Sequence, residues 1–167
     1  MIRIIDKITE VAAHVGAWML FSIGVMVTYE VVMRKVFNSP TIWVDETARF
    51  FQVWAVYLAG AHILKRRSLI TVELFTGSLS AGKLRLLELL SLAIIGFFSF
   101  VALYYGTAVV LESIEMGRRT STMLGVPKWL TESAIPVGFG LLFVQVVVEF
   151  FKLVRGDDVG ALTGHQV

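Results

Sequence analysis

The sequence has no cysteine and little charge: 17% of its 167 residues are Asp, Glu, Lys or Arg. Without cysteine the chain has no disulfide, no thiolate nucleophile and no cysteine-ligated metal or iron–sulfur site. It also lacks the H-E-x-x-H, Walker A, G-x-G-x-x-G and G-x-S-x-G motifs, so no enzymatic activity is predicted. A net charge of +2 gives no indication of nucleic-acid binding.

The chain is rich in apolar residues. They make up 56% of the chain, and the mean hydropathy is +0.76. Soluble domains carry about 45–50% apolar residues, and a soluble chain this short has too much surface for its volume to bury more. The composition therefore predicts an integral membrane protein with the lipid bilayer as its solvent.

Four apolar segments are candidates for membrane-spanning helices, which need roughly 20 residues each. They are Val11–Tyr29, Phe50–Leu64, Leu89–Leu111 and Ser133–Val148. The second and fourth reach that length only with their flanking aromatic residues. The predicted fold is all-α, an integral membrane four-helix bundle that forms a single domain over residues 1–155, with helices at about 11–33, 44–64, 86–111 and 129–152.

The connecting segments refine this picture. Thr41–Arg49 mixes aromatic with charged residues, which predicts a short interfacial helix between the first two spans. Pro127 and Pro136 predict an irregular start or a kink in the fourth helix. Residues 156–167 form a short polar tail. If the N-terminus is cytoplasmic, nine Lys or Arg residues lie inside and six outside, which favours both termini in the cytoplasm.

Acidic and basic residues are paired near the helix ends expected outside the cytoplasm. Glu30 and Arg34 are four residues apart, and Glu46 and Arg49 are three apart, so each pair shares one helical face. Charged groups in a bilayer are usually paired or close to the interface. Three roles stay open for these residues: a solvated belt, a structural network that docks a neighbouring segment or subunit, or a site for a coupling ion.

Two further groups have competing interpretations. Glu115 precedes Arg118 and Arg119 by three and four residues, which is typical of helix termination and anchoring at the interface. His14 and His62 lie near the inner ends of the first two helices, where they could ligate a haem. A haem-bearing membrane anchor of a redox complex is therefore the alternative function, and a self-associating channel is a third possibility.

Several short motifs resemble the small membrane subunit of TRAP (tripartite ATP-independent periplasmic) transporters, the DctQ-like family. The resemblance covers roughly residues 5–155, and it rests on the order and spacing of these motifs more than on any single one. The motifs are Tyr29–Phe37, Trp43–Arg49, Ala59–His62, Val72–Leu74 and Thr120–Trp129, with Pro136 and Gly138 following.

The resemblance implies a four-helix subunit of the bacterial inner membrane that scaffolds a large membrane subunit carrying the transport path. It further implies a periplasmic substrate-binding protein that delivers the solute, usually an organic acid, and uptake driven by a sodium gradient. Trp43, Glu46 and Arg49 match the family's recurring motif, so we expect structural or partner contacts there. Neither a cofactor nor a substrate site is implied for this subunit, and the solute itself is not indicated.

Overall fold

The computed structural model describes residues 2–65, 81–122 and 124–155, and these residues form five helices and no strand. The long helices are α1 (Ile2–Val36), α2 (Ile42–Lys65), α4 (Ala81–Glu115) and α6 (Ala134–Arg155), with the short α5 (Lys128–Glu132) before α6. The all-α class predicted from the sequence is therefore confirmed. The polar tail at residues 156–167 and the Val72–Leu74 motif lie outside the described residues.

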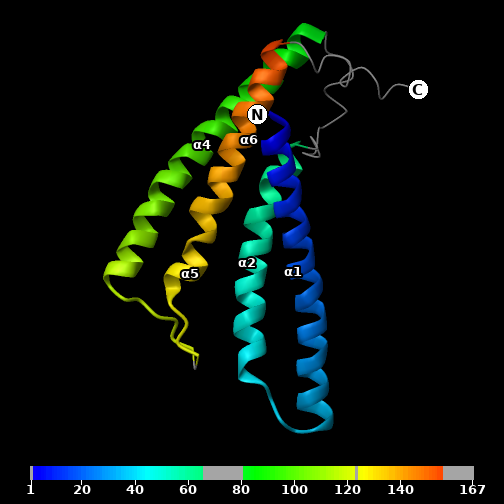
Figure 1. Ribbon diagram of the computed structural model, residues 1–167, viewed down its shortest axis with the longest axis vertical. Helices are drawn as coiled ribbons and strands as arrows, with labels where there is room; N and C mark the ends of the chain where they lie inside the picture. The colour runs from blue at the N-terminus through cyan, green and yellow to red at the C-terminus, as the bar shows by residue number, and fades with distance from the viewer. Residues whose placement is uncertain (1, 66–80, 123, 156–167) are drawn as a thin grey trace, which may run out of the picture.

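The four long helices lie side by side in the order α1, α2, α6, α4 (Figure 1). α1 and α2 form one antiparallel hairpin, and α4 with α6 forms the other. The two hairpins meet where α2 packs on α6, whereas α1 and α4 occupy opposite edges and share no packed interface in the described part of the chain. The arrangement is thus a row of helices rather than a closed four-helix bundle.

Small residues allow the helices of this row to approach closely. A Cβ at Gly16 would lie 3.0 Å from the carbonyl oxygen of Ala55 on α2, and one at Gly138 would lie 2.6 Å from Cβ of Tyr57. Such backbone contacts are the way helices pack in lipid, where burial of apolar surface gives no driving force between them. Beyond these contacts, Leu64, Leu92, Val146 and Leu153 form the buried core where α2, α4 and α6 converge.

The expectation of a separate interfacial helix at residues 41–49 is wrong. Residues 37–41 form a turn, and α2 then runs without a break from Ile42 to Lys65. The turn closes because the Ser39 N–H donates to the Met33 carbonyl oxygen at 3.1 Å while Asn38 adopts a φ of 51°. The first turns of α2 are polar, but they continue the spanning helix.

The expected irregular start of the fourth helix is confirmed. α5 begins directly after Pro127 and ends at Glu132, and α6 begins at Ala134. Ser133 joins them, and its N–H still donates to the Trp129 carbonyl oxygen at 2.9 Å. Pro136 lies in the first turn of α6, where a missing backbone N–H costs little.

Three helical stretches of the described chain are long and apolar enough to cross a membrane: Ile4–Val36, Leu86–Glu115 and Lys128–Val154. α2 is not among these stretches, and its first turns carry Asp45, Glu46 and Arg49. α1 and α4 each contain 35 residues, so each is about 52 Å long. Both exceed the hydrocarbon thickness of about 30 Å, and their ends therefore reach the polar interface or water.

Candidate functional site

Polar side chains gather at the two ends of the helix row, and three clusters connect different elements of the chain. We call them the corner, the clasp and the terminal junction. The corner joins α1 to the start of α2, and the clasp joins α2 to the segment between α4 and α5. Both lie at the end of the molecule that carries the interhelical turns. The terminal junction joins α1, α2 and α6 at the opposite end.

The corner is built on Glu30, whose side chain is almost fully buried. Its Oε1 accepts from Nη2 of Arg34 at 2.5 Å and from Nε at 3.0 Å. Its Oε2 accepts from the Thr41 N–H at 3.0 Å and also from the Thr41 hydroxyl. Because the Thr41 N–H lies just ahead of α2, the carboxylate satisfies a donor at that helix start and holds the turn between the two helices.

The clasp is built on Glu46. Its Oε1 accepts from the Thr120 hydroxyl at 2.9 Å and from the Thr122 hydroxyl. The backbone amides of Leu124 and Val126 lie near the same carboxylate and stabilise its charge. The segment is itself closed by the Thr120 N–H, which donates to the Val126 carbonyl oxygen at 2.9 Å. One side chain of α2 therefore holds the segment that connects α4 to α5.

The structure places the five candidate residues of the sequence in different settings. Glu30 and Arg34 form an ion pair, but Glu46 turns away from Arg49 toward the clasp. Arg49 is exposed and forms no ion pair within the described residues. Trp43 is 44% exposed, and its ring packs on Tyr29 at a centroid distance of 6.3 Å. Trp43 and Arg49 are thus exposed, whereas Glu30 and Glu46 are engaged in hydrogen bonds within the chain.

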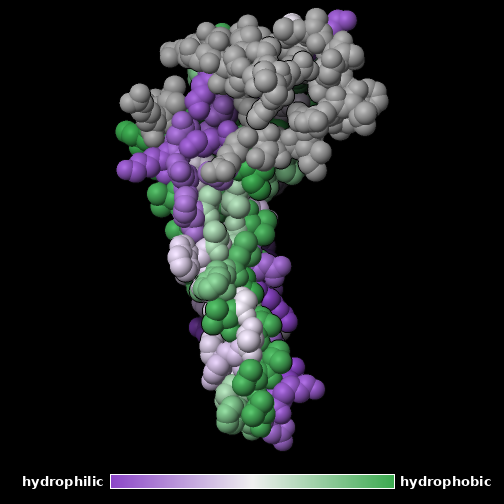
Figure 2. Space-filling model, turned by 90° about the vertical axis from the view of Figure 1, so that its right-hand side faces the viewer, coloured by the Kyte–Doolittle hydropathy of each residue, from purple (hydrophilic) through white to green (hydrophobic). Residues whose placement is uncertain are grey.

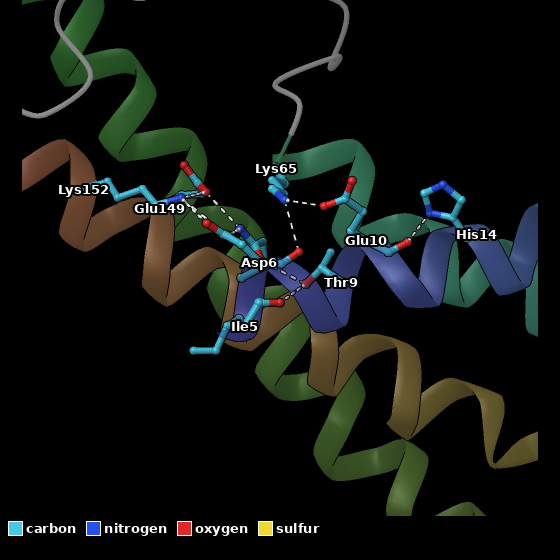
Figure 3. A network of polar contacts seen from close by, with 9 residues as sticks. Ile5, Asp6, Thr9, Glu10, His14, Lys65, Glu149 and Lys152 are labelled. Atoms are coloured by element: carbon cyan, nitrogen blue, oxygen red, sulfur yellow. Dashed lines mark hydrogen bonds and ion pairs between the residues drawn. The ribbon is translucent and has the colours of Figure 1, made fainter. Parts of the chain in front are cut away.

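The terminal junction is a cluster that the sequence analysis missed (Figure 3). Its centre is Gln145 of α6, which is fully buried. The Gln145 Oε1 lies 3.0 Å from the Thr9 hydroxyl of α1, and its Nε2 donates to Asp6 at 3.2 Å and to Glu149 at 2.9 Å. A buried amide in a membrane helix needs such partners, so Gln145 inside an apolar run was the available signal.

Two lysines complete the terminal junction. Nζ of Lys152 lies 2.8 Å from Glu149 and 3.3 Å from Asp6 (Figure 3). Nζ of Lys65 at the end of α2 donates to the backbone carbonyl oxygen of Asp6 at 3.1 Å and lies 3.6 Å from Glu10. The cations neutralise carboxylates that would otherwise be costly away from water. The cluster fixes the first turns of α1 to both α2 and α6.

The two histidines do not form an evident haem site. Lys65 lies beside Asp6, and Gly16 lies against Ala55, so the antiparallel register places His62 about 7.5 Å from His14 along the axes. His14 is exposed, and its Nδ1 lies 2.8 Å from the carbonyl oxygen of Glu10. Two axial ligands of one haem must face each other, so the geometry does not favour the redox-anchor alternative.

An all-α chain with three long apolar helices and polar junctions at its ends is an integral membrane protein. Residues 23–156 match the family described as tripartite ATP-independent periplasmic transporters, DctQ component. The chain belongs to this family, and the resemblance seen in the sequence is confirmed. It is therefore a small-subunit component of a TRAP transporter, and the family is one of transporter components rather than enzymes. No curated protein matches the chain.

The clasp can be tested by proteolysis, because trypsin cleaves after Arg119, directly before Thr120 of the clasp. Substituting Glu46→Ala removes the acceptor of Thr120 and Thr122, so cleavage after Arg119 should become about tenfold faster, because a hydrogen bond to a charged group is worth at least that factor. The measurement is limited trypsin proteolysis of the protein in bilayer nanodiscs. Asp45→Ala is the matched control, since Asp45 is an exposed acid of the same turn. Equal cleavage of both variants would contradict the clasp.

Proposed function

We propose that this chain is the scaffold subunit of a TRAP-type secondary transporter in the bacterial inner membrane. It packs against a large membrane subunit that carries the transport path and holds that subunit in the bilayer. Uptake of an organic acid, delivered by a periplasmic substrate-binding protein, is coupled to the sodium gradient. The family match supports this assignment, because the family belongs to tripartite transporters.

The observation that carries the proposal is the lack of an enclosed interior in the described part of the chain. Only 6% of the most apolar window of α1 and 17% of that of α4 are buried, against 33% for the stretch that contains α6 (Figure 2 shows the α1 edge). A row of helices has two uncovered faces, and it provides no closed path for a solute among the described residues. Such a shape suits a support for another protein.

The same shape supports α2 as the fourth membrane span, within the single domain proposed over residues 1–155. α2 lies between α1 and α6 and contacts protein on both sides, and Glu46 in its polar first turns is held by the clasp. With both termini in the cytoplasm, as the distribution of basic residues favours, the corner and the clasp lie on the periplasmic side. Trp43 and Arg49 are then placed to contact the binding protein or the large subunit.

Transport measurements test the proposal directly. Cells that express the large subunit and the binding protein without this chain should take up no radiolabelled solute, using the solute that the binding protein retains. The amount of large subunit in the membrane should fall as well, because its apolar contact surface is left uncovered. Restoring this chain should restore both. Normal uptake in its absence would show that the chain is not a scaffold for transport.

A further inference from the structure

A cleft lies at the end of α4 that faces the clasp side of the molecule. It has a volume of about 190 Å³ and is lined by Ile114, Gly117, Arg118, Arg119, Pro127 and Trp129. The chain turns there because Gly117 adopts a φ of 57°, the Gly117 N–H donates to Ile114, and the Arg118 N–H donates to Ser113. This is the left-handed glycine turn that ends many helices, and it directs two consecutive arginines to the cleft.

The charges at the cleft are not balanced. Arg118 pairs with Glu112 at 2.6 Å, and both side chains remain partly exposed. Arg119 is exposed and has no carboxylate partner among residues 2–65, 81–122 and 124–155. Lys128, just before Trp129, is also exposed and forms no ion pair in the same ranges. With the exposed Glu115 counted beside Glu112, the three basic groups exceed the two acidic ones by one, so the cleft presents a small surplus of positive charge to a ligand.

The other wall of the cleft is apolar and continues along α4. Ile114 is 52% exposed, and Leu111, one turn earlier on the same face, is 61% exposed. Trp129 borders the cleft at the start of α5, and tryptophan is enriched at the depth of lipid headgroups. The cleft places positive charge next to a tryptophan and then an apolar helix face. A lipid has the same order of parts, with a charged headgroup followed by an apolar acyl chain.

We propose that this cleft binds the phosphate group of a membrane lipid. Arg119 and Arg118 contact the phosphate, Trp129 lies at headgroup depth, and an acyl chain follows Ile114 and Leu111 along α4. An acidic segment of another protein would use the arginines but not the apolar wall, so the lipid fits more of the cleft. This inference needs only that the chain spans a bilayer, and it stands apart from the scaffold role.

Native mass spectrometry of the purified full-length chain with phosphatidylglycerol tests the inference. Arg119→Ala should bind this lipid about fivefold more weakly, the factor that one arginine supplies near a charged lipid surface. Glu112→Gln should bind about twofold more tightly, since it removes one exposed opposing charge and releases Arg118. Arg49→Ala is the matched control, an exposed arginine outside the cleft lining, and it should bind as the unaltered chain does.

Three results would overturn the inference. The first is equal binding of phosphatidylglycerol by the Arg119→Ala variant and the unaltered chain. The second is equally tight binding of a diglucosyl diacylglycerol, a lipid of similar shape without phosphate. The third is full displacement of phosphatidylglycerol by inorganic phosphate or by an acidic peptide, which would identify the cleft as a site for free anions or for protein.

Discussion

Substituting Gly138→Val should separate α2 from α6 and lower the free energy of unfolding by about 3 kcal/mol, the upper part of the usual cost of overpacking. A Cβ at this position would lie 2.6 Å from Cβ of Tyr57 and 2.9 Å from its carbonyl oxygen. Backbone atoms cannot move aside as the end of a flexible side chain can. Since α2 and α6 form the main contact between the hairpins, the whole row should loosen.

The measurement is reversible unfolding of the purified chain in mixed detergent micelles, followed by tryptophan fluorescence. Gly60→Val is the matched control, because a Cβ at Gly60 would meet no atom within 4 Å and the change in helix propensity is the same. Because valine has a slightly higher helix propensity than glycine, this control should not lower stability. Similar losses in the two variants would mean that the loss does not come from contact with Tyr57, and the close α2–α6 contact would be refuted.

Substituting Lys152→Met should be the second most damaging single change, with a loss of about 2–3 kcal/mol. Nζ of Lys152 lies within 3.3 Å of both Glu149 and Asp6, and the Glu149 side chain is only 6% exposed. Removing one partner of a fully buried ion pair costs about 3–5 kcal/mol, and the 21–22% exposure of Lys152 and Asp6 reduces that figure. The effect arises because two neighbouring carboxylates lose their shared cation.

A double variant separates this cause from lost packing. Lys152→Met combined with Glu149→Gln removes one of the two uncompensated charges, so it should recover at least half of the lost stability in the same unfolding measurement. Lys35→Met, at an exposed position in the last turn of α1, is the control and should change stability little. If the double variant is less stable than the single one, the ion pair is not the reason for the loss.

Contacts between residues close in the sequence could be predicted from it, whereas contacts between distant segments could not. Glu30 and Arg34 are four residues apart on one helix, and the ion pair expected from that spacing is present at 2.5 Å. Glu46 and Arg49 have an equally suitable spacing, yet Glu46 binds Thr120 and Thr122 instead. A spacing of three or four residues reports only that two side chains share a face. The spacing does not show whether a distant segment of the chain supplies a hydrogen-bond donor that the acid binds instead.

The terminal junction illustrates the same limit more strongly. Gln145 lies more than 130 residues from Asp6 and Thr9 in the chain but within hydrogen-bond distance of both in the fold. In the sequence, Glu149 and Lys152 resemble an ordinary pair at the interface. Only the approach of α1 to the end of α6 turns them into part of a buried cluster, because burial depends on which helices become neighbours.

The sequence by itself determined that this protein is helical, that it belongs in a membrane, and which transporter family it resembles. Apolar runs of membrane-spanning length and local motifs carry that information, since a bilayer requires each spanning segment to satisfy its own backbone hydrogen bonds. Only the tertiary structure decided the order of the helices in the row, the continuity of α2, and the partners of Glu46 and Gln145. Those features depend on close backbone approach at residues such as Gly138, and lipid offers apolar helix faces no preference among possible neighbours.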